Sequence, residues 1–354
     1  MENEVLLWNQ PEWIAGAKAW IEQAVRAAGK RVSGPIQQLR ERPWASVMTV
    51  PTSGGLYYFK ANYPYSQFEA RLTQELAATA PHCMPELLAV DASRGWMMTR
   101  DAGTPLRERI TAPEDLRVLD SFLPMLAELQ MAWLNRDPEL LAMGVPDNRV
   151  QTLPEAFALL ADDRETLMIG VADWLNNEQW ARVRSLVPYY ADLCARLLAS
   201  PIPQSIHYDD MQGSNVFLRG AGAAARVTFS DWGDSCVGHP FSSLLIFLRA
   251  MSDLIGLPDE ATQTPEGLPP ALARLRDAYL EPWQRFDTHT NLVETFNLAW
   301  RVGMVSRAIS WQKSIAALPE AYRAEYRYTV PAWLSEFLLA IPSARLKPTS
   351  GPGS

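Results

Sequence analysis

The first regular pattern along the chain is an apolar stripe near its start. Apolar side chains recur every three or four residues, which predicts an amphipathic helix over residues 11–28. The stripe consists of Ile14, Ala17, Ile21, Val25 and Ala28. Pro11 suits the first turn of such a helix, and Gly29 suits the position just after its end.

The residues that follow have the patterns of short strands around one helix. We expect three strands, a helix and two further strands, in that order, at residues 35–41, 46–50, 56–61, 66–79, 86–91 and 96–99. The stretches Thr52-Ser53-Gly54-Gly55 and Ser93-Arg94-Gly95 lie between neighbouring strands and are typical of tight turns. This part of the chain therefore predicts a small lobe built on an antiparallel sheet.

Most of the chain beyond residue 112 has helical periodicity. Helices are expected at residues 114–135, 153–161 and 179–200, and at a late apolar stripe over residues 293–315. Short strands and loops are expected between residues 201 and 238, with a hairpin turn at Gly220-Ala221-Gly222-Ala223.

These patterns together predict an α+β protein with two lobes. We expect a small antiparallel-sheet lobe at residues 1–100 and a larger, mainly helical lobe at residues 101–345. Residues 346–354 are expected to form a flexible tail.

The composition indicates an ordinary folded protein. Of 354 residues, 48% are hydrophobic and 20% are charged, and no apolar run reaches the roughly 18 residues of a membrane helix. The N-terminus lacks the features of a secretory signal, and three scattered cysteines without metal-type spacing indicate a reducing compartment. A net charge of -8 argues against nucleic acid as a partner. We therefore expect a cytoplasmic protein that binds neither membranes nor nucleic acid.

Three polar residues of the loop zone have a spacing that indicates phosphoryl transfer. Asp210 and Asn215 are five positions apart, and Asp231 ends the apolar run over residues 227–230. A carboxylate can orient a hydroxyl nucleophile and accept its proton. Mg²⁺ prefers carboxylate and amide oxygens together with phosphates. The spacing from Asn215 selects Asp210 rather than Asp209, and the whole pattern is the acid set of nucleotide-dependent phosphoryl transfer.

This pattern resembles that of the aminoglycoside phosphotransferase and choline kinase superfamily. The resemblance rests on residues 208–216, Tyr-Asp-Asp-Met-Gln-Gly-Ser-Asn-Val, and on residues 229–234, Phe-Ser-Asp-Trp-Gly-Asp. It implies a protein-kinase-like fold, with Asp210 as the catalytic base and with Asn215 and Asp231 as ligands of Mg²⁺. Asp234 is then either a third acid of the metal site or a loop cap.

The resemblance extends to the N-terminal lobe, which it identifies as the nucleotide-binding lobe. Lys60 has the position of the lysine that binds the α- and β-phosphates, and Glu69 has that of its helical partner. Glu75 is a second option, on a different face of the same helix. Met98 and Arg100 lie in the segment 97–101, whose backbone groups are implied to hydrogen-bond the nucleotide base.

The sequence departs from the family pattern in three places. The loop between the first two strands has no glycine, although protein kinases place a glycine-rich loop over the phosphates there; Arg42 and Ser46 are candidates to contact phosphate instead. Tyr208 stands where a histidine is usual, with His207 one position earlier. Ser243 stands where family members carry an acid with a structural role.

The resemblance implies an ATP- or GTP-dependent, Mg²⁺-dependent kinase that phosphorylates a hydroxyl of a small molecule, as a monomer or homodimer. An antibiotic such as an aminoglycoside is one candidate acceptor, and choline, homoserine or a sugar is another. The contrasting class is a non-catalytic, nucleotide-binding pseudokinase. The acceptor site is expected in the helical lobe after residue 238. Its acidic and aromatic candidates are Asp253, Glu281, Asp287, Glu294, Trp283 and Trp300.

Overall fold

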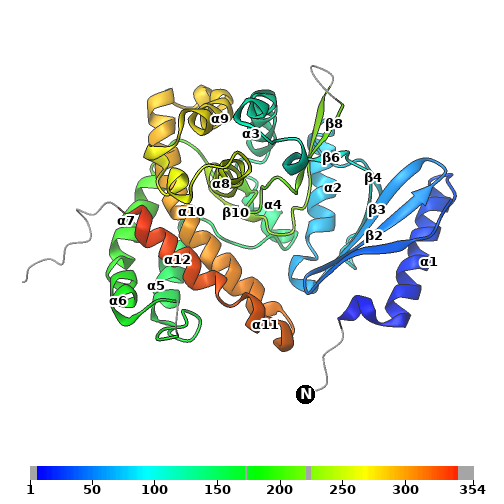
Figure 1. Cartoon of the computed structure of the whole chain (residues 1–354), viewed down its shortest axis with the longest axis horizontal. Coiled ribbons are helices and arrows are strands. Elements are labelled where there is room, and N and C mark those ends of the chain that lie inside the picture. Colours follow the sequence, from blue (N-terminus) through cyan, green and yellow to red (C-terminus); the bar gives the residue numbers. More distant parts are fainter. Residues whose placement is uncertain (1–5, 172–173, 221–224, 342–354) are drawn as a thin grey trace, which may run out of the picture.

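Five antiparallel strands form the sheet of the N-terminal lobe (Figure 1). In a computed structural model, which describes residues 6–171, 174–220 and 225–341, the strand order is β1-β2-β3-β5-β4. The strands are β1 (Gln37–Arg42), β2 (Ala45–Thr52), β3 (Gly55–Asn62), β4 (Leu87–Asp91) and β5 (Trp96–Arg100). The five expected strands are confirmed, and their ends shift by one or two residues.

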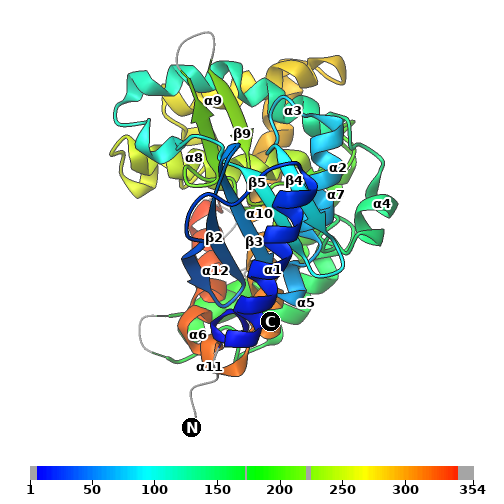
Figure 2. The same cartoon turned by 90° about the vertical axis from the view of Figure 1, so that its right-hand side faces the viewer.

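Helix α1 (Pro11–Ala27) covers one face of this sheet (Figure 2). Its apolar stripe packs on Phe59, Trp96 and Met98 in a separate small core. Each large apolar side chain buried there stabilises the lobe by about 1.5–3 kcal/mol. Because side chains alternate along a strand, Lys60 next to Phe59 projects from the opposite face.

Helix α2 (Glu69–Thr79) follows β3 and packs against β4. The helix begins three residues later than expected, since residues 64–66 form a separate 3₁₀ turn. Its first residue, Glu69, is fully buried.

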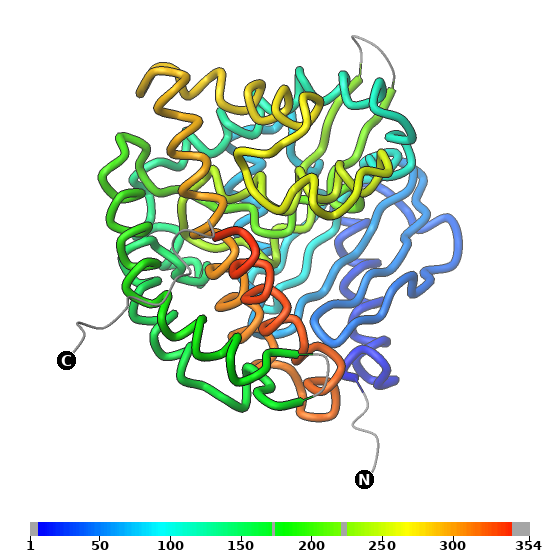
Figure 3. Tube along the Cα trace, turned by 60° about the vertical axis from the view of Figure 1, so that its left-hand side comes forward, coloured from blue at the N-terminus to red at the C-terminus, as the bar shows by residue number. Residues whose placement is uncertain are grey.

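Ten helices in the part of the chain that the structure describes build the C-terminal lobe (Figure 1). They are α3 (Leu123–Met131), α4 (Asp137–Ala142), α5 (Leu153–Asp162), α6 (Asn177–Ser185), α7 (Val187–Leu198), α8 (Leu244–Leu254), α9 (Pro270–Leu280), α10 (His289–Ala317), α11 (Glu320–Tyr326) and α12 (Thr329–Ala340). Helix α10 contacts α5, α7, α8 and α12, and Figure 3 shows α12 in red alongside it. The late helix is therefore the centre of the lobe.

Two of the expected long helices are broken, so these predictions are wrong in detail. The segment 114–135 forms a 3₁₀ stretch up to Ser121 followed by α3, and the segment 179–200 forms α6 and α7. Pro124 and Pro188 each occupy the second position of the later helix. A proline has no amide hydrogen and clashes with the preceding turn, so it begins a helix rather than continuing one.

Two small sheets fix the loops that carry the polar residues. One consists of β6 (Thr104–Pro105), β8 (Val216–Arg219) and β9 (Arg226–Phe229), and the other of β7 (Ser205–His207) and β10 (Cys236–Gly238). Strands β8 and β9 are paired as expected, while most of their predicted turn, at residues 221–224, lies outside the described residues. The loop 208–215 thus runs between β7 and β8, and the loop 230–235 between β9 and β10.

The observed arrangement confirms the predicted α+β fold with a small sheet lobe and a larger helical lobe. Within the described ranges, no helix combines the length and the apolar character that crossing a bilayer requires.

Candidate active site between the lobes

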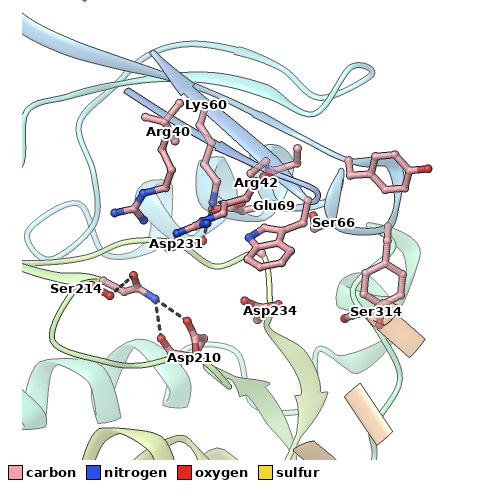
Figure 4. A pocket seen from close by; sticks show the side chains of 18 of the residues that line it. Arg40, Arg42, Lys60, Ser66, Glu69, Asp210, Ser214, Asp231, Asp234 and Ser314 are labelled. Atoms are coloured by element: carbon pink, nitrogen blue, oxygen red, sulfur yellow. Dashed lines mark hydrogen bonds and ion pairs between the residues drawn. The ribbon is translucent and has the colours of Figure 1, made fainter. Parts of the chain in front are cut away.

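A cavity of about 390 Å³ lies between the sheet and the helical lobe (Figure 4). Its wall on the side of the sheet includes Arg40, Arg42, Lys60 and Glu69. Its opposite wall includes Asp210, Ser214, Asn215, Asp231, Asp234 and Arg307. The cavity therefore gathers residues that lie far apart in the sequence.

Lys60 lies between two carboxylates. Its Nζ is 2.8 Å from Oε1 of Glu69 and 2.6 Å from Oδ1 of Asp231. Burial would lower the pKa of Lys60, but Asp231 and Glu69 outweigh it and raise the pKa above its ordinary value. Glu69 also accepts hydrogen bonds from the Asn62 side chain at 2.8 Å and from the Trp232 amide at 3.1 Å. Glu69 thus ties β3 to the loop 230–235.

The backbone at Asp231 is held in an unusual conformation. Its φ of 62° lies in the left-handed region, which a residue other than glycine adopts only where its surroundings compensate the strain. Two residues later, a Cβ added at Gly233 would lie 2.9 Å from Oε2 of Glu69. A side chain at this position would displace the Glu69 carboxylate, which Lys60 and Asn62 hold in place.

Tyr208 and Ser243 hold the two loops together. The Tyr208 hydroxyl donates to the carbonyl of Ser230, and its ring stacks on Trp232 with 4.1 Å between the ring centroids. The hydroxyl of Ser243 accepts the amide hydrogen of Tyr208 at 2.9 Å, and it accepts a hydrogen bond from Gln130 at the same distance. Tyr208 and Ser243 both differ from the residues that the resemblance leads one to expect, and both still form hydrogen bonds that hold the two loops in place.

The carboxylate of Asp210 has hydrogen-bond donors on both oxygens. Oδ2 accepts from Gln212 Nε2 at 2.8 Å and from Asn215 Nδ2 at 2.9 Å, while Oδ1 accepts from Arg307 Nη2 at 2.9 Å. Asn215 Nδ2 also donates to the carbonyl of Asp210 at 2.9 Å, so the five-residue spacing closes the loop on itself. The donors fix the orientation of the carboxylate toward the cavity.

The neighbouring aspartate faces the protein interior. Asp209 is 2% exposed, and its Oδ1 lies 3.3 Å from Nη1 of Arg307 and 3.5 Å from Nε2 of His207. Burial lowers the pKa of His207, which favours its neutral form. Asp209 does not line the 390 Å³ cavity, whereas Asp210 does. The two adjacent carboxylates therefore face different surroundings, the protein interior and the cavity.

Arg307 of α10 is a site residue that the sequence reasoning missed. Besides its ion pairs with Asp209 and Asp210, its guanidinium donates to the backbone carbonyl of Asp209. Burial would lower the pKa of Arg307, but these carboxylates outweigh it and raise the pKa. The sequence offered one sign of this role: Arg307 lies in the mainly apolar segment 302–309. A charge that is buried with such a segment requires a partner.

Asp234 projects into the cavity from the loop after Asp231 (Figure 4). The residue is exposed to the cavity, and the surrounding walls remove part of its hydration. This desolvation, together with the carboxylates of Asp210 and Asp231, raises the pKa of Asp234 to about 8.

The side chains of two residues predicted to bind nucleotide do not line this cavity, while the predicted contact of the base with the backbone of residues 97–101 stays a prediction. Met98 is fully buried in the small core under α1, and Arg100 pairs with Glu86 at 3.2 Å. Both side chains belong to the sheet face opposite to Lys60, because Met98 lies opposite Phe59 and neither lines the cavity.

The acceptor candidates proposed after residue 238 do not line the cavity either. Trp283 and Trp300 are fully buried in the core of the helical lobe, so neither of these candidates is available to contact a ligand. The four acidic candidates are also absent from the cavity wall. The aromatic residues that line it are Trp44, Tyr63, Tyr65 and Trp311.

Asn215 and Asp231 offer the oxygen ligands that Mg²⁺ prefers. Asn215 Oδ1 accepts a hydrogen bond only from the adjacent Ser214 hydroxyl among the described residues, and Asp231 is half-buried at the cavity wall. No cluster of three or more His, Cys, Asp or Glu in the described ranges is arranged to hold a metal by itself. Mg²⁺ is commonly bound by one or two carboxylates together with substrate phosphates, and Asp231 is a carboxylate of this kind.

Solved structures of small-molecule kinases are similar to this chain. An ethanolamine kinase of Plasmodium vivax is 14% identical, with 88% of this chain and 83% of that chain covered and a TM-score of 0.52. A macrolide 2'-phosphotransferase of Brachybacterium faecium is 12% identical, with 88% and 97% covered and a TM-score of 0.53. A thermostable mutant of an aminoglycoside phosphotransferase, in a ternary complex with AMP-PNP and hygromycin B, is 15% identical, with 94% and 99% covered and a TM-score of 0.52.

No family model and no curated protein sequence matches the chain. The similarity is therefore one of structure, and at this level of sequence identity it establishes the fold. The chain has the protein-kinase-like fold of the aminoglycoside and macrolide phosphotransferases and the choline and ethanolamine kinases.

Proposed function

We propose that the protein is a nucleoside-triphosphate-dependent phosphotransferase that acts on a hydroxyl group of a small molecule. The observation that carries the proposal is the single cavity that combines the Lys60–Glu69 pair with Asp210, Asn215 and Asp231. Structures of similar fold include enzymes for aminoglycosides, macrolides and ethanolamine, which supports a small-molecule acceptor.

In the proposed reaction the acceptor oxygen forms a bond to the γ-phosphorus of ATP or GTP. The bond from that phosphorus to the β,γ-bridging oxygen breaks, and the nucleoside diphosphate leaves. Asp210 orients the acceptor hydroxyl and accepts its proton, and Arg307 positions Asp210 for this role.

Lys60 contacts phosphate oxygens in this proposal, while Glu69 keeps the ammonium group in place. Asn215 and Asp231 would hold Mg²⁺, which neutralises phosphate charge when it is bound. Most of the rate enhancement then comes from positioning and charge stabilisation.

The test is phosphate transfer from ATP and GTP, with Mg²⁺, to a panel of aminoglycosides, macrolides, nucleosides, choline, ethanolamine, homoserine and sugars. We expect transfer to one acceptor class. The variant Asp210→Asn should lower the turnover roughly 10²–10⁴-fold, as the loss of a general base does, while the affinity for nucleotide stays near that of the wild type.

The variant Asp209→Asn is the matched comparison, because the two carboxylates are adjacent but only Asp210 lines the main cavity. It should mainly lower the melting temperature, since Asp209 is buried beside Arg307. Full turnover in the Asp210 variant would contradict its assignment. Nucleotide binding without transfer to any acceptor would contradict the proposed activity and favour a nucleotide-binding pseudokinase.

A further inference from the structure

The hairpin of β1 and β2 projects over the cavity without any glycine. Arg42 pairs with Ala45, so the turn consists of Pro43 and Trp44 alone. A glycine-rich loop binds phosphate through backbone amides that approach the ligand closely. Here Pro43 has no amide hydrogen and the turn has side chains at both positions, so the hairpin tip is poorly suited to bind phosphate through its backbone.

The register of the sheet directs two arginines of β1 toward the cavity. Arg40 lies opposite Val47, and Val47 lies opposite Lys60, so these three side chains form one row across the face that Lys60 occupies. Arg42 is two residues beyond Arg40 and therefore projects from the same face. Both arginines line the cavity, and Figure 4 shows them beside Lys60 and on the side of the cavity opposite Asp210.

The charges of the other cavity cations are already compensated. Lys60 contacts Glu69 and Asp231, and Arg307 contacts Asp209 and Asp210. By contrast, Arg40 and Arg42 are exposed, and their guanidinium groups have no hydrogen-bond or ion-pair partner within the described ranges. Two uncompensated positive charges that face one cavity favour an anionic ligand between the lobes.

We propose that Arg40 and Arg42 bind the polyphosphate chain of the nucleotide through their side chains, in place of a glycine-rich loop. The inference rests on the proposed function and names a second part of its nucleotide site. The planar guanidinium group forms two parallel hydrogen bonds with a phosphate, which suits this ligand better than a single ammonium would.

Ser46, the other candidate from the sequence, has no part in this site. It is fully buried and accepts a hydrogen bond from the Gln38 side chain at 3.2 Å. Its partner on β1 is Glu41, which lies between the two arginines and therefore projects from the other face of the sheet. The alternation along β1 thus separates the arginines from Ser46.

The test measures dissociation constants by calorimetry for ATP, GTP, AMP and inorganic tripolyphosphate, with the wild type, Arg40→Ala, Arg42→Ala and the double variant. Hydrogen bonds to charged groups contribute about 1.5–3 kcal/mol. Each single substitution should therefore weaken binding of the triphosphate roughly tenfold or more, and the double variant should weaken it further. AMP should be affected least, since it lacks the β- and γ-phosphates.

Arg26→Ala is the control, because Arg26 is exposed on α1 and the same unit of charge is lost on the opposite side of the sheet. Its affinities should equal those of the wild type. Triphosphate affinity of the double variant within twofold of the control would overturn the inference while leaving the proposed function intact.

Failure of the proposed function has a different signature: the wild type either binds nucleotide without transferring phosphate to any acceptor, or binds neither ATP nor GTP. The first result leaves the nucleotide titrations of the arginine variants fully readable. In the second case, the dissociation constant for tripolyphosphate still tests whether the arginines bind polyphosphate. Binding by the wild type that is lost in the double variant supports a polyphosphate site, and absence of binding by the wild type overturns it.

Discussion

Asp234 lies in a cavity that already contains the carboxylates of Asp210 and Asp231. Burial within the cavity walls and these neighbouring charges raise its pKa to about 8, whereas an aspartate of the unfolded chain has a pKa of about 3.9. Between these two values the folded protein binds a proton that the unfolded chain has released. The stabilising contribution of Asp234 is therefore fully present below about pH 4 and is lost as the pH rises to about 8.

We expect Asp234→Asn to remove this part of the pH dependence, because asparagine remains neutral. The melting temperature of the variant should rise relative to the wild type between about pH 5 and pH 9, with most of the gain near the upper end. Thermal denaturation in the presence of a chelator, at several pH values, measures the difference. Asp192→Asn, on the exposed face of α7, is the control. Parallel curves for Asp234→Asn and the wild type would contradict the prediction.

Much of the candidate site could be predicted residue by residue. Asp210 and Asn215 belong to one short loop, so their spacing in the sequence fixes their geometry. Arg307 could not be predicted in this way, because 97 residues separate it from Asp210 and only the tertiary fold brings them together. The same limit applies to Arg40, whose direction depends on a sheet register that the sequence does not specify.

Helix α10 brings Arg307 from the centre of the helical lobe to the loop 208–215. The helix is buried without interruption from Ala299 to Ile309, so it has no polar face there. A charge in that stretch is stable only when it is paired, and Arg307 finds its partners in Asp209 and Asp210. The helix therefore anchors the loop 208–215 as well as forming the core.

Substitution of Arg307 should affect turnover more than nucleotide affinity. Arg307→Gln removes the charge and one donor to Asp210, and breaking a buried pair of this kind costs about 3–5 kcal/mol. Turnover should fall by roughly 100-fold or more, while the KM for nucleotide stays within a few fold of the wild type. Steady-state kinetics well below the melting temperature of the variant measure both quantities.

Arg307→Lys is the matched variant, because it keeps the charge but loses the fork of donors. It should recover part of the turnover. If both variants lose turnover only in proportion to their loss of folded protein, Arg307 has a structural role and does not position Asp210.

The order of elements was predictable because alternation and helical periodicity are local properties of the chain. The breaks before α3 and α7 required weighing Pro124 and Pro188 against continuous apolar patterns. The position of Met98 was beyond this reasoning, since Met97 and Met98 are both apolar and alternation gives no direction for either side chain.

At the scale of the whole molecule, an aromatic contact joins the two lobes on one side of the cavity. Trp44, in the turn of the β1–β2 hairpin, lies edge-on to Tyr326 of α11 with 5.0 Å between the ring centroids. Tyr326 in turn stacks with Trp311 of α10, and both tryptophans line the cavity. An aromatic pair of this kind contributes about 0.5–1.5 kcal/mol beyond its buried area. The contact therefore ties the hairpin that carries Arg40 and Arg42 to the helical lobe beside the cavity.

We expect Tyr326→Ala to loosen both lobes at this contact, although only the helical lobe is altered. Loss of about 1 kcal/mol corresponds to roughly fivefold more opening, so amide exchange should accelerate by a similar factor in the β1–β2 hairpin as well as in α11. Trp44→Ala should produce the same pair of effects from the other side. Tyr326→Phe is the control, since it keeps the ring and should leave exchange in the hairpin unchanged. Faster exchange in α11 alone would show that the contact does not couple the lobes, because each element would then open independently of the other.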